Sequence, residues 1–451
     1  MYPKIAICSF LGTRERAKTS WQLTAHNCER DLASLAGEET IFGGSAVEKL
    51  KRLQAELEPL SRHYDVLVAN PPYMGSSSLG KWMGAWVKKH YPEAYRDLCT
   101  SFIDQGFGMS SDNGYSAMVT MQSWMFLGSF EKLRGKILRN HSISSMAHLG
   151  TRAFGAIGGE VVSTTATVFT NAKCEVKGAY FRLVDMGSEE EKQAGLLEAL
   201  ANPDCGWFYR CASYDFGKVP GSPIAYWISN SMLNAFDEFA PMSETASPKQ
   251  GLATGDNDLF IRQWWEIGTE RTGFGFADRA AAHASGCKWF PCNKGGGYRK
   301  WFGNNELVVN WENDGEAIKG LVRNGKQASR PQNTEWYFKE GMTWGTISSA
   351  DLSMRYSPAG YMFETKGSMC FAENKDSLLY CLAFTNSSVV KAFQKILSPT
   401  LDFHEGPIGK LPLACEHKSE AVDLAQESVL LAKDDWDSFE ISFEFKKHPL
   451  I

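Results

Sequence analysis

Long apolar runs are scarce in this chain of 451 residues, which argues against a membrane protein. The uncharged stretch over residues 115–130 is interrupted by Thr120, Gln122 and Ser123, whereas a membrane-spanning helix takes about 20 apolar residues. Residues 1–16 contain a brief apolar run but no small-residue cleavage site, so they do not resemble a signal peptide. We therefore expect a cytoplasmic protein that has no membrane as a partner.

Paired cysteines are also missing. The chain has 11 cysteines, an odd number, and no CxxC pair. The closest two, Cys287 and Cys292, have no accompanying His pair at metal-ligand spacing. This usage is typical of free thiols in a reducing compartment, and it predicts neither a disulfide framework nor a metal site.

Charge of one sign is not in excess. The 47 Lys and Arg residues and 52 Asp and Glu residues leave a net charge of −5, which excludes a protein that coats nucleic acid by bulk charge but allows a local basic groove. No fixed repeat runs through the chain, so coiled-coil and collagen-like classes are excluded. With 27 Phe and 14 Trp, the sequence has enough apolar material for two or three packed cores.

The first part of the chain alternates strand and helix patterns. Residues 66–69 form a short apolar run typical of a strand buried on both faces. A similar run covers residues 115–123, and the apolar spacing of residues 95–111 predicts a helix between the two strands. Further segments follow, with an earlier helix over 45–60 and strands over 142–150, 161–169 and 178–186. The alternation predicts an α/β domain with a largely parallel sheet that ends in a hairpin.

The character of the sequence changes twice. After about residue 190 comes a long stretch rich in Trp, Gly and short turns, which predicts an α+β domain over residues 191–415. Residues 416–451 are acidic with aromatics and predict the start of a third segment. The expected domains are therefore 1–190, 191–415 and 416–451.

The motif Asn70-Pro71-Pro72-Tyr73 follows the first apolar strand, at the edge where open α/β sheets bind ligands. A planar amino group is a poor nucleophile because its lone pair is delocalised. The Asn70 amide oxygen and the Pro71 carbonyl can each accept one of its N–H bonds, which favours a pyramidal nitrogen. Prolines hold this backbone rigidly, and stacking of a base on Tyr73 contributes about 1–3 kcal/mol. The motif predicts methyl transfer from S-adenosylmethionine to a planar nitrogen, by positioning and electrostatics.

Several long segments resemble one family in the same order along the chain. They are VANPPYMGS, AMVTMQSWMFLGSFEKLR, HLGTRAFGAIGGEVVSTTA, GLATGDNDLF, KWFPCNKGGGYRKWFGN and WDSFEISFEF. Together they resemble the PglX adenine-specific DNA methyltransferases of BREX phage-defence systems, from about residue 60 onward. The resemblance implies methylation of adenine N6 in double-stranded DNA, with the target base flipped from the duplex. It also implies a Rossmann-like methyltransferase sheet followed by a target-recognition domain, and other BREX proteins as further partners.

Two more inferences depend on this resemblance. Phe154 precedes an alternating strand, as an aromatic does in related adenine methyltransferases, so it is a candidate for the opposite face of the flipped adenine; a core or turn aromatic is the alternative. Such enzymes also carry a glycine-rich strand-to-helix turn that cradles the methyl donor, and nothing before Tyr64 matches it. We therefore expect a sheet that is incomplete on its N-terminal side, in the central and C-terminal portion of a larger protein.

A basic and aromatic segment stands out in the second region. Residues 286–305 contain four basic residues and no acidic ones, around a triple glycine. Basic side chains neutralise phosphates, glycine amides approach a backbone closely and aromatics stack. The candidate DNA-binding residues are Lys288, Lys294, Arg299, Lys300 and Trp301, and the alternative is a solvated loop over a Trp-rich core. Five other basic residues are weaker DNA-binding candidates, and for each the favoured interpretation is an ordinary surface charge: Arg262, Arg323, Lys326, Arg330 and Arg355.

Three functions stay open at this point. The first is an adenine-N6 DNA methyltransferase, and the second is a DNA-recognition module without turnover of its own, because the donor-binding turn is missing. The third is a methyltransferase for a protein glutamine or ribosomal RNA, since the motif suits any planar nitrogen. The aromatic and basic second region favours DNA over the third. Among the histidines, His148 and His404 are expected to be structural.

Overall fold

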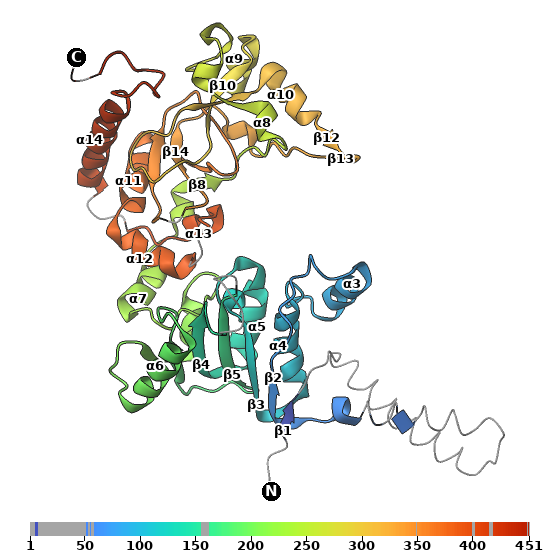
Figure 1. Ribbon diagram of the computed structural model, residues 1–451. Coiled ribbons are helices and arrows are strands. Elements are labelled where there is room, and N and C mark those ends of the chain that lie inside the picture. Colours follow the sequence, from blue (N-terminus) through green and yellow to red (C-terminus); the bar gives the residue numbers. More distant parts are fainter. Residues whose placement is uncertain are drawn as a thin grey trace, which may run out of the picture. The chain divides into compact units, whose positions relative to one another are not determined.

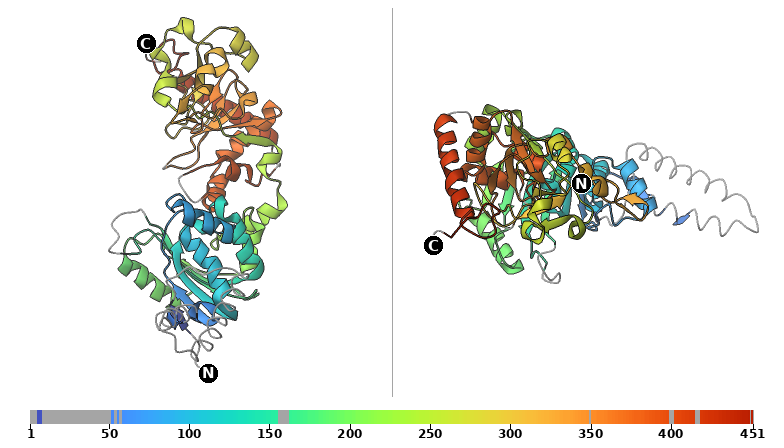
Figure 2. Two further views of the ribbon diagram at one scale, coloured as in Figure 1. Left: turned by 90° about the vertical axis from the view of Figure 1, so that its right-hand side faces the viewer. Right: turned by 90° about the horizontal axis from the view of Figure 1, so that it is seen from above.

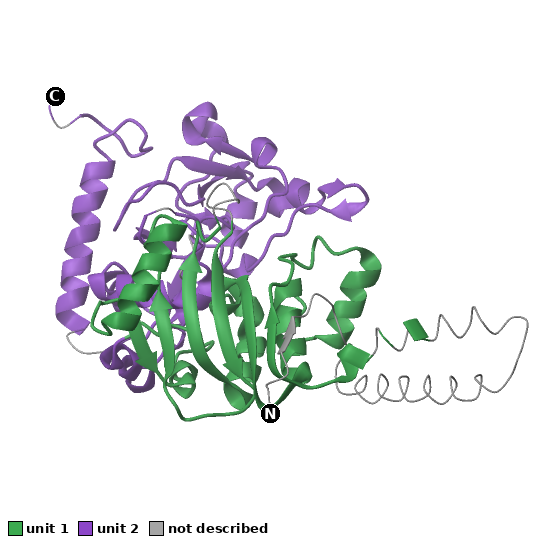
Figure 3. Ribbon diagram, turned by 60° about the horizontal axis from the view of Figure 1, so that its bottom comes forward, with its two compact units in different colours: residues 1–228 green, residues 229–451 purple. Residues whose placement is uncertain are grey.

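The computed structural model describes residues 5–7, 51–52, 55, 58–154, 162–348, 350–398, 402–414, 418–448 and 450. The chain divides into two compact units, residues 1–228 and 229–451 (Figure 3). The expected boundary near 190 therefore falls inside the first unit. The reason is packing: Phe216, Ile224 and Tyr226 belong to the hydrophobic core of the first unit. The expected helix over 45–60 lies largely outside the described residues.

Unit 1 is built on a seven-stranded sheet with the order β1-β2-β3-β5-β4-β6-β7 (Figure 1). Strands β5 and β7 run antiparallel to their neighbours, and the other pairings, β1 with β2, β2 with β3 and β4 with β6, are parallel. The bounds of the strands are Ile5–Ile7 (β1), Tyr64–Ala69 (β2), Ser110–Met121 (β3), Ser142–Gly150 (β4), Thr164–Thr170 (β5), Gly178–Arg182 (β6) and Phe208–Cys211 (β7). The helices are Lys81–His90 (α3), Leu98–Met109 (α4), Glu131–Asn140 (α5) and Glu189–Ala201 (α6). The Rossmann-like α/β sheet is thus as expected. However, three of its six pairings are antiparallel, so the sheet is not largely parallel, and β4 lies between β5 and β6, which therefore do not form the expected hairpin.

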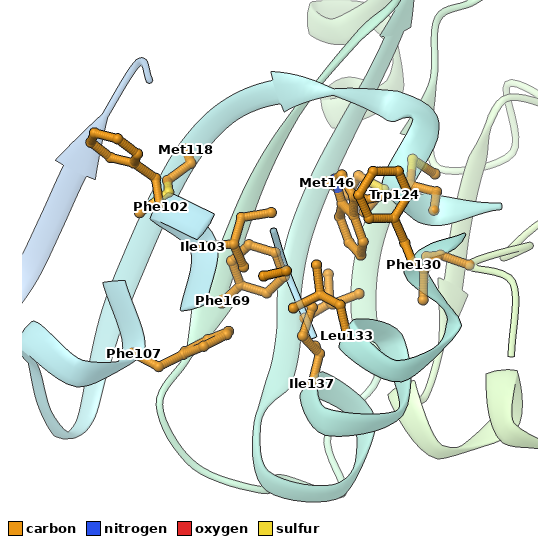
Figure 4. Packing of buried hydrophobic residues seen from close by; sticks show 14 of the residues in the cluster. Phe102, Ile103, Phe107, Met118, Trp124, Phe130, Leu133, Ile137, Met146 and Phe169 are labelled. Carbon is orange, nitrogen blue, oxygen red and sulfur yellow. The ribbon is translucent and has the colours of Figure 1, made fainter. Parts of the chain in front are cut away.

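One face of the sheet carries the core of unit 1. Helices α4 and α5 both lie against this face (Figure 2), because their apolar side chains interleave with alternate residues of the strands. Figure 4 shows this packing, in which the labelled residues are Phe102, Ile103, Phe107, Met118, Trp124, Phe130, Leu133, Ile137, Met146 and Phe169.

The other face of the sheet is covered more sparsely. Helix α6 packs against β4 and β6 on this side, through the small cluster of Phe181, Leu183 and Ala199. At the β2 and β3 end, Val68 is 40% exposed and Tyr115 is also exposed. The expectation that β2 is buried on both faces is therefore wrong for the described part of the chain, in which no helix covers these two side chains.

Unit 2 is an α+β domain with two four-stranded sheets, ordered β16-β10-β11-β9 and β15-β14-β17-β8, and a separate hairpin, β12-β13. Its strands are Ala246–Lys249 (β8), Ile261–Gln263 (β9), Trp289–Asn293 (β10), Leu307–Asn310 (β11), Val322–Arg323 (β12), Lys326–Gln327 (β13), Gly341–Trp344 (β14), Met354–Ser357 (β15), Met362–Phe363 (β16) and Met369–Ala372 (β17). Its helices are Asn230–Glu238 (α7), Asn257–Phe260 (α8), Arg279–Ala284 (α9), Glu312–Lys319 (α10), Lys375–Thr385 (α11), Ser388–Leu397 (α12), Glu405–Gly409 (α13) and Lys418–Trp436 (α14).

The C-terminal segment is part of unit 2 and not a separate body. Helix α14 packs along α11, and the residues after it return to the domain. The Phe443 ring contacts the rings of Phe274, at 4.9 Å between centroids, and Trp264, at 6.2 Å. The acidic and aromatic residues after 416 are therefore part of unit 2, where a third segment was expected.

Candidate functional site

The Asn70–Tyr73 motif lies directly after the C-terminal end of β2, as the sequence predicts. Asn70 is exposed, Pro71 is buried and Tyr73 is partly buried. The Tyr73 hydroxyl is 3.3 Å from the Asn70 Oδ1 atom and 3.4 Å from the Val119 carbonyl oxygen of β3, so it can donate to either acceptor. Burial, and to a lesser degree the nearby Cys99, raises the pKa of Tyr73 to about 12, so the hydroxyl keeps its proton. The contact orients the amide: Asn70 Oδ1 faces Tyr73 and has a second lone pair for a ligand.

Asp97 holds the next part of this loop in place. Its carboxylate accepts a hydrogen bond from the Met74 backbone N–H at 3.3 Å and from the Cys99 N–H at 3.0 Å, which caps helix α4. The Leu98 N–H donates to the Met74 carbonyl at 2.9 Å, and Gly75 pairs with Asp97. The motif is therefore fixed at both ends, by β2 and by the start of α4. Sequence reasoning missed Asp97, because the helix expected over 95–111 includes this residue, whereas α4 begins at Leu98 with Asp97 as its N-cap.

A buried polar chain lies along the same edge of the sheet. Gln122 follows β3, and its Oε1 atom is 2.8 Å from His148 Nε2; His148 Nδ1 is 2.9 Å from the Tyr226 hydroxyl. Burial, with a smaller contribution from Arg182, lowers the pKa of His148 to about 3. The imidazole is therefore neutral at physiological pH and fixes Gln122 and Tyr226, in agreement with a structural role.

Phe154 lies just beyond the end of β4 and is partly buried. Strands β2 and β3 are parallel, β5 is antiparallel to both β3 and β4, and so β2 and β4 end at the same edge of the sheet. Phe154 thus shares an edge with Asn70 and Tyr73. Residues 155–161, the glycine-containing segment that follows in the sequence, lie outside the described residues, and the stacking role of Phe154 stays a prediction.

The basic segment of unit 2 comprises Lys288, strand β10 and the loop between β10 and β11, and most of its charges have partners within the protein. Lys288 is 3.1 Å from Glu312, and Arg299 is 3.0 Å from Asp435. The Lys300 ammonium donates to the Asn386 carbonyl at 2.6 Å. Lys294 differs from these three, because it has no such bond among the contacts of the described residues. Lys294 is therefore the basic side chain of this loop most available to a phosphate.

Trp301 supports the loop rather than projecting from it. Its backbone is left-handed, with φ at 73°, and its N–H and carbonyl bond to Met354 and Tyr356 of β15. The aromatic that does project is Tyr298, which is 54% exposed beside the triple glycine. Sequence reasoning missed Tyr298, although its place after Gly295-Gly296-Gly297 was a usable signal.

The interpretation of Arg355 as a surface charge is wrong, because its side chain is buried. Its guanidinium donates to the Gly295 carbonyl at 2.8 Å, below the triple glycine. Burial lowers the pKa of Arg355 to about 10, against the opposing effect of Glu306. Arg355 therefore holds the loop from inside the domain.

Within the described residues, no group of three or more His, Cys, Asp or Glu side chains could hold a metal ion. Among the helices of the same residues, none is long and apolar enough to cross a membrane.

Comparison with known proteins supports the resemblance inferred from the motifs. Residues 4–154 match the family model of the Eco57I restriction-modification methylases. The chain is 41% identical, over 89% of its length, to the adenine-specific methyltransferase PglX of Lacticaseibacillus casei (strain Zhang). It is 40% identical, also over 89% of its length, to the adenine-specific methyltransferase BrxX of Escherichia coli O9:H4 (strain HS). The chain covers 34% and 32% of these two proteins, so it spans about a third of the length of its curated relatives.

A solved structure shares the fold. The Type IIL restriction-modification enzyme MmeI, in complex with DNA, matches 85% of this chain with a TM-score of 0.54 and 9% sequence identity. The match covers 52% of the MmeI chain. At this identity the likeness concerns the fold alone, and the sequence relatives carry the resemblance to PglX-type methyltransferases.

Proposed function

We propose that this chain supplies the target-base edge and the DNA-recognition unit of an adenine-N6 DNA methyltransferase of the BREX type. It would act in the cytoplasm on a flipped adenine in double-stranded DNA and mark self DNA, with S-adenosylmethionine as the methyl donor and other BREX proteins as partners. The observation that carries the proposal is the geometry of Asn70–Tyr73: an exposed amide, oriented by Tyr73, on a rigid loop at the ligand-binding edge of a Rossmann-like sheet.

The residues of the motif have separate tasks in this proposal. The Asn70 Oδ1 atom and the Pro71 carbonyl accept the two N–H bonds of the adenine amino group and hold its nitrogen for reaction. Tyr73 already contacts Asn70 Oδ1, so the acceptor keeps its orientation before the base arrives. The Tyr73 ring, and on the other side Phe154, would hold the base by stacking. The pKa of Tyr73, raised to about 12, makes its hydroxyl a hydrogen-bond donor and not a base.

The described residues do not fit the methyl donor as they fit the base. Of the polar groups at this edge, Asn70 is suited to an amino group, and Gln122 and His148 are bonded to each other. No glycine-rich strand-to-helix turn precedes Tyr64 in the sequence. We therefore derive no step that involves the donor.

The experiment compares methyl transfer and DNA binding in the same protein. We expect Asn70→Ala to lower the rate of methylation of duplex DNA at least about 100-fold, the effect of removing one positioned hydrogen-bonding group from an active site. Binding of duplex DNA should change by less than about threefold, because the proposed DNA-binding surface is in unit 2. Undiminished methylation by Asn70→Ala would contradict the proposal.

The alternative function is a DNA-recognition module without turnover of its own. The wild-type protein distinguishes the two functions: DNA binding without any methyl transfer, in the presence of S-adenosylmethionine, would support the module and reject the enzyme.

A further inference from the structure

Among the described elements of unit 2, the β12–β13 hairpin is the most exposed, and it projects from the unit (Figures 1 and 3). Val322 pairs with Gln327 and Arg323 with Lys326 across the ladder. The turn between them, Asn324-Gly325, has both residues left-handed, with φ at 50° and 71°, as a tight type I′ turn requires. All six residues from 322 to 327 are exposed, and Val322 is 58% exposed. The tip therefore contributes nothing to the core of the domain.

A two-residue ladder has little stability of its own, so the geometry of the hairpin must come from its base. On one side, the base is bonded to helix α10 and the residues after it. The buried Ser329 hydroxyl donates to the Ile318 carbonyl at 2.5 Å, and the Gln327 amide donates to the Lys319 carbonyl at 2.8 Å. The Ala328 N–H donates to the Leu321 carbonyl at 2.9 Å.

On the other side, the base is held by the turn within GLATGDNDLF, residues 251–260. Ala253 and Arg330 exchange two backbone hydrogen bonds, at 3.0 and 2.7 Å. Gly255 has a left-handed φ of 77°, and a Cβ atom there would lie 2.7 Å from the backbone of Ala328. Only glycine fits this close approach. We call the contacts of Ala253 and Gly255 with Ala328 and Arg330 the clamp, because they fix the base of the hairpin. The clamp therefore sets the direction in which the β12–β13 hairpin projects, although the exposed tip of the hairpin does not stabilise the core.

The chemistry of the hairpin fits duplex DNA. Between Glu316 and Glu335 the sequence has no acidic residue but has the basic residues Lys319, Arg323, Lys326 and Arg330. A two-stranded ribbon fits the major groove of B-DNA, where Arg, Lys and Asn side chains hydrogen-bond base edges and apolar groups contact the thymine methyl. The exposed tip presents these kinds of side chain together: Arg323, Lys326, Asn324 and Val322.

We propose that the β12–β13 hairpin enters the major groove and reads base edges, with Arg323 as the principal reading residue. This inference rests on the proposed function, since it assumes that unit 2 binds DNA. Without DNA, Arg323 is paired with Asp256, the cap of helix α8. The Arg323 side chain is 56% exposed, and ion pairs at such positions are weak. The guanidinium can therefore exchange the carboxylate for a guanine edge.

The test measures base preference separately from affinity. The protein is mixed with a library of short duplexes of random sequence, and the bound fraction is sequenced. We expect the wild type to enrich a short site. Arg323→Ala should lose about 5- to 150-fold of the preference at one or two positions of that site, the discrimination of one good base contact. Lys395→Ala, which removes one exposed positive charge from α12, is the matched control and should enrich the unchanged site.

Enrichment of the unchanged site by Arg323→Ala would overturn the role of the hairpin and leave the proposed function intact. A wild-type protein that binds no duplex would overturn both. As a second variant, Gly255→Ala disturbs the clamp and leaves Arg323 in place. We expect it to weaken the preference at the same positions, and a preference equal to that of the wild type would show that the clamp does not direct the hairpin.

Discussion

The two candidate sites of this protein differ in the sequence separation of the residues that contact one another. At the edge of the unit 1 sheet, four consecutive residues contain the proposed acceptors, and Tyr73 contacts Asn70 within the same tetrapeptide. In the β10–β11 loop of unit 2, the charges are paired with distant residues. Arg299 contacts Asp435, and Lys300 contacts the carbonyl of Asn386. A site that is local in sequence can be inferred from a motif, whereas the availability of a charge depends on the whole domain.

The largest effect is expected for a substitution of Arg355, which supports the β10–β11 loop of unit 2 from inside the domain. Arg355→Ala removes the donor to the Gly295 carbonyl and leaves Glu306 without its nearby cation. We expect the free energy of unfolding of unit 2 to fall by about 3 kcal/mol, the upper value for loss of a buried hydrogen bond made by a charged group. Denaturant unfolding followed by Trp fluorescence measures it. The matched exposed variant, Arg323→Ala, should change stability by less than about 0.5 kcal/mol; equal losses in both would show that Arg355 is not a support.

The next effect concerns unit 1 and its buried histidine. The pKa of His148 is about 3 in the folded protein, against 6.5 for the free side chain. Between these two values the unfolded chain binds a proton that the native protein does not bind. Stability should therefore fall as the pH drops below 6.5, by about 1.4 kcal/mol per pH unit from this group. Unfolding measured between pH 7 and pH 5 tests this.

The control for that prediction is His148→Gln, which has no titrating group and keeps a hydrogen-bonding side chain at this position. Over the same interval, the free energy of unfolding of this variant should fall less steeply with falling pH than that of the wild type. The difference between the two slopes should equal the contribution assigned to His148. The same slope in both proteins would mean that other groups cause the acid sensitivity.

The smallest effect is expected on the salt dependence of DNA binding, and it distinguishes Lys294 from Lys300 in the β10–β11 loop. If Lys294 contacts a phosphate, Lys294→Ala should reduce the slope of log binding constant against log salt concentration by about 0.9. Lys300→Ala should leave that slope within about 0.3 of the wild type, because the Lys300 ammonium is bonded to the Asn386 carbonyl. DNA binding at several salt concentrations decides this. Equal slope changes in both variants would reject the distinction drawn between these two lysines.

The sequence predicted the parts of the fold that depend on short patterns. The apolar runs at 66–69 and 115–123 correspond to β2 and β3, and the helix expected over 95–111 corresponds to α4, Leu98–Met109. The pattern of β2 could not show that Val68 is exposed, because a run of four apolar residues does not tell whether both faces are covered. The boundary at 228 was missed because β7 and residues 213–227 join the first core through contacts between distant residues.

The candidate sites follow the same rule. Asn70 and Tyr73 could be located because the Asn70–Tyr73 motif is specific both in its residue types and in its place directly after an apolar strand. Arg355 was interpreted as a surface charge because nothing adjacent in the sequence indicates its burial below Gly295. The β12–β13 hairpin has a clear turn signal, Asn324-Gly325, but its anchoring by Gly255 and Ser329 exists only in the folded domain.

The central claim is that Asn70 positions an adenine for methylation, and the nucleoside composition of cellular DNA tests it most directly. DNA from cells that carry the wild-type gene, and from otherwise identical cells with Asn70→Ala, is digested and its N6-methyladenine is measured by mass spectrometry. We predict N6-methyladenine above the level of cells lacking the gene for the wild type only, with the variant at the background level. An equal excess in both strains would contradict the account.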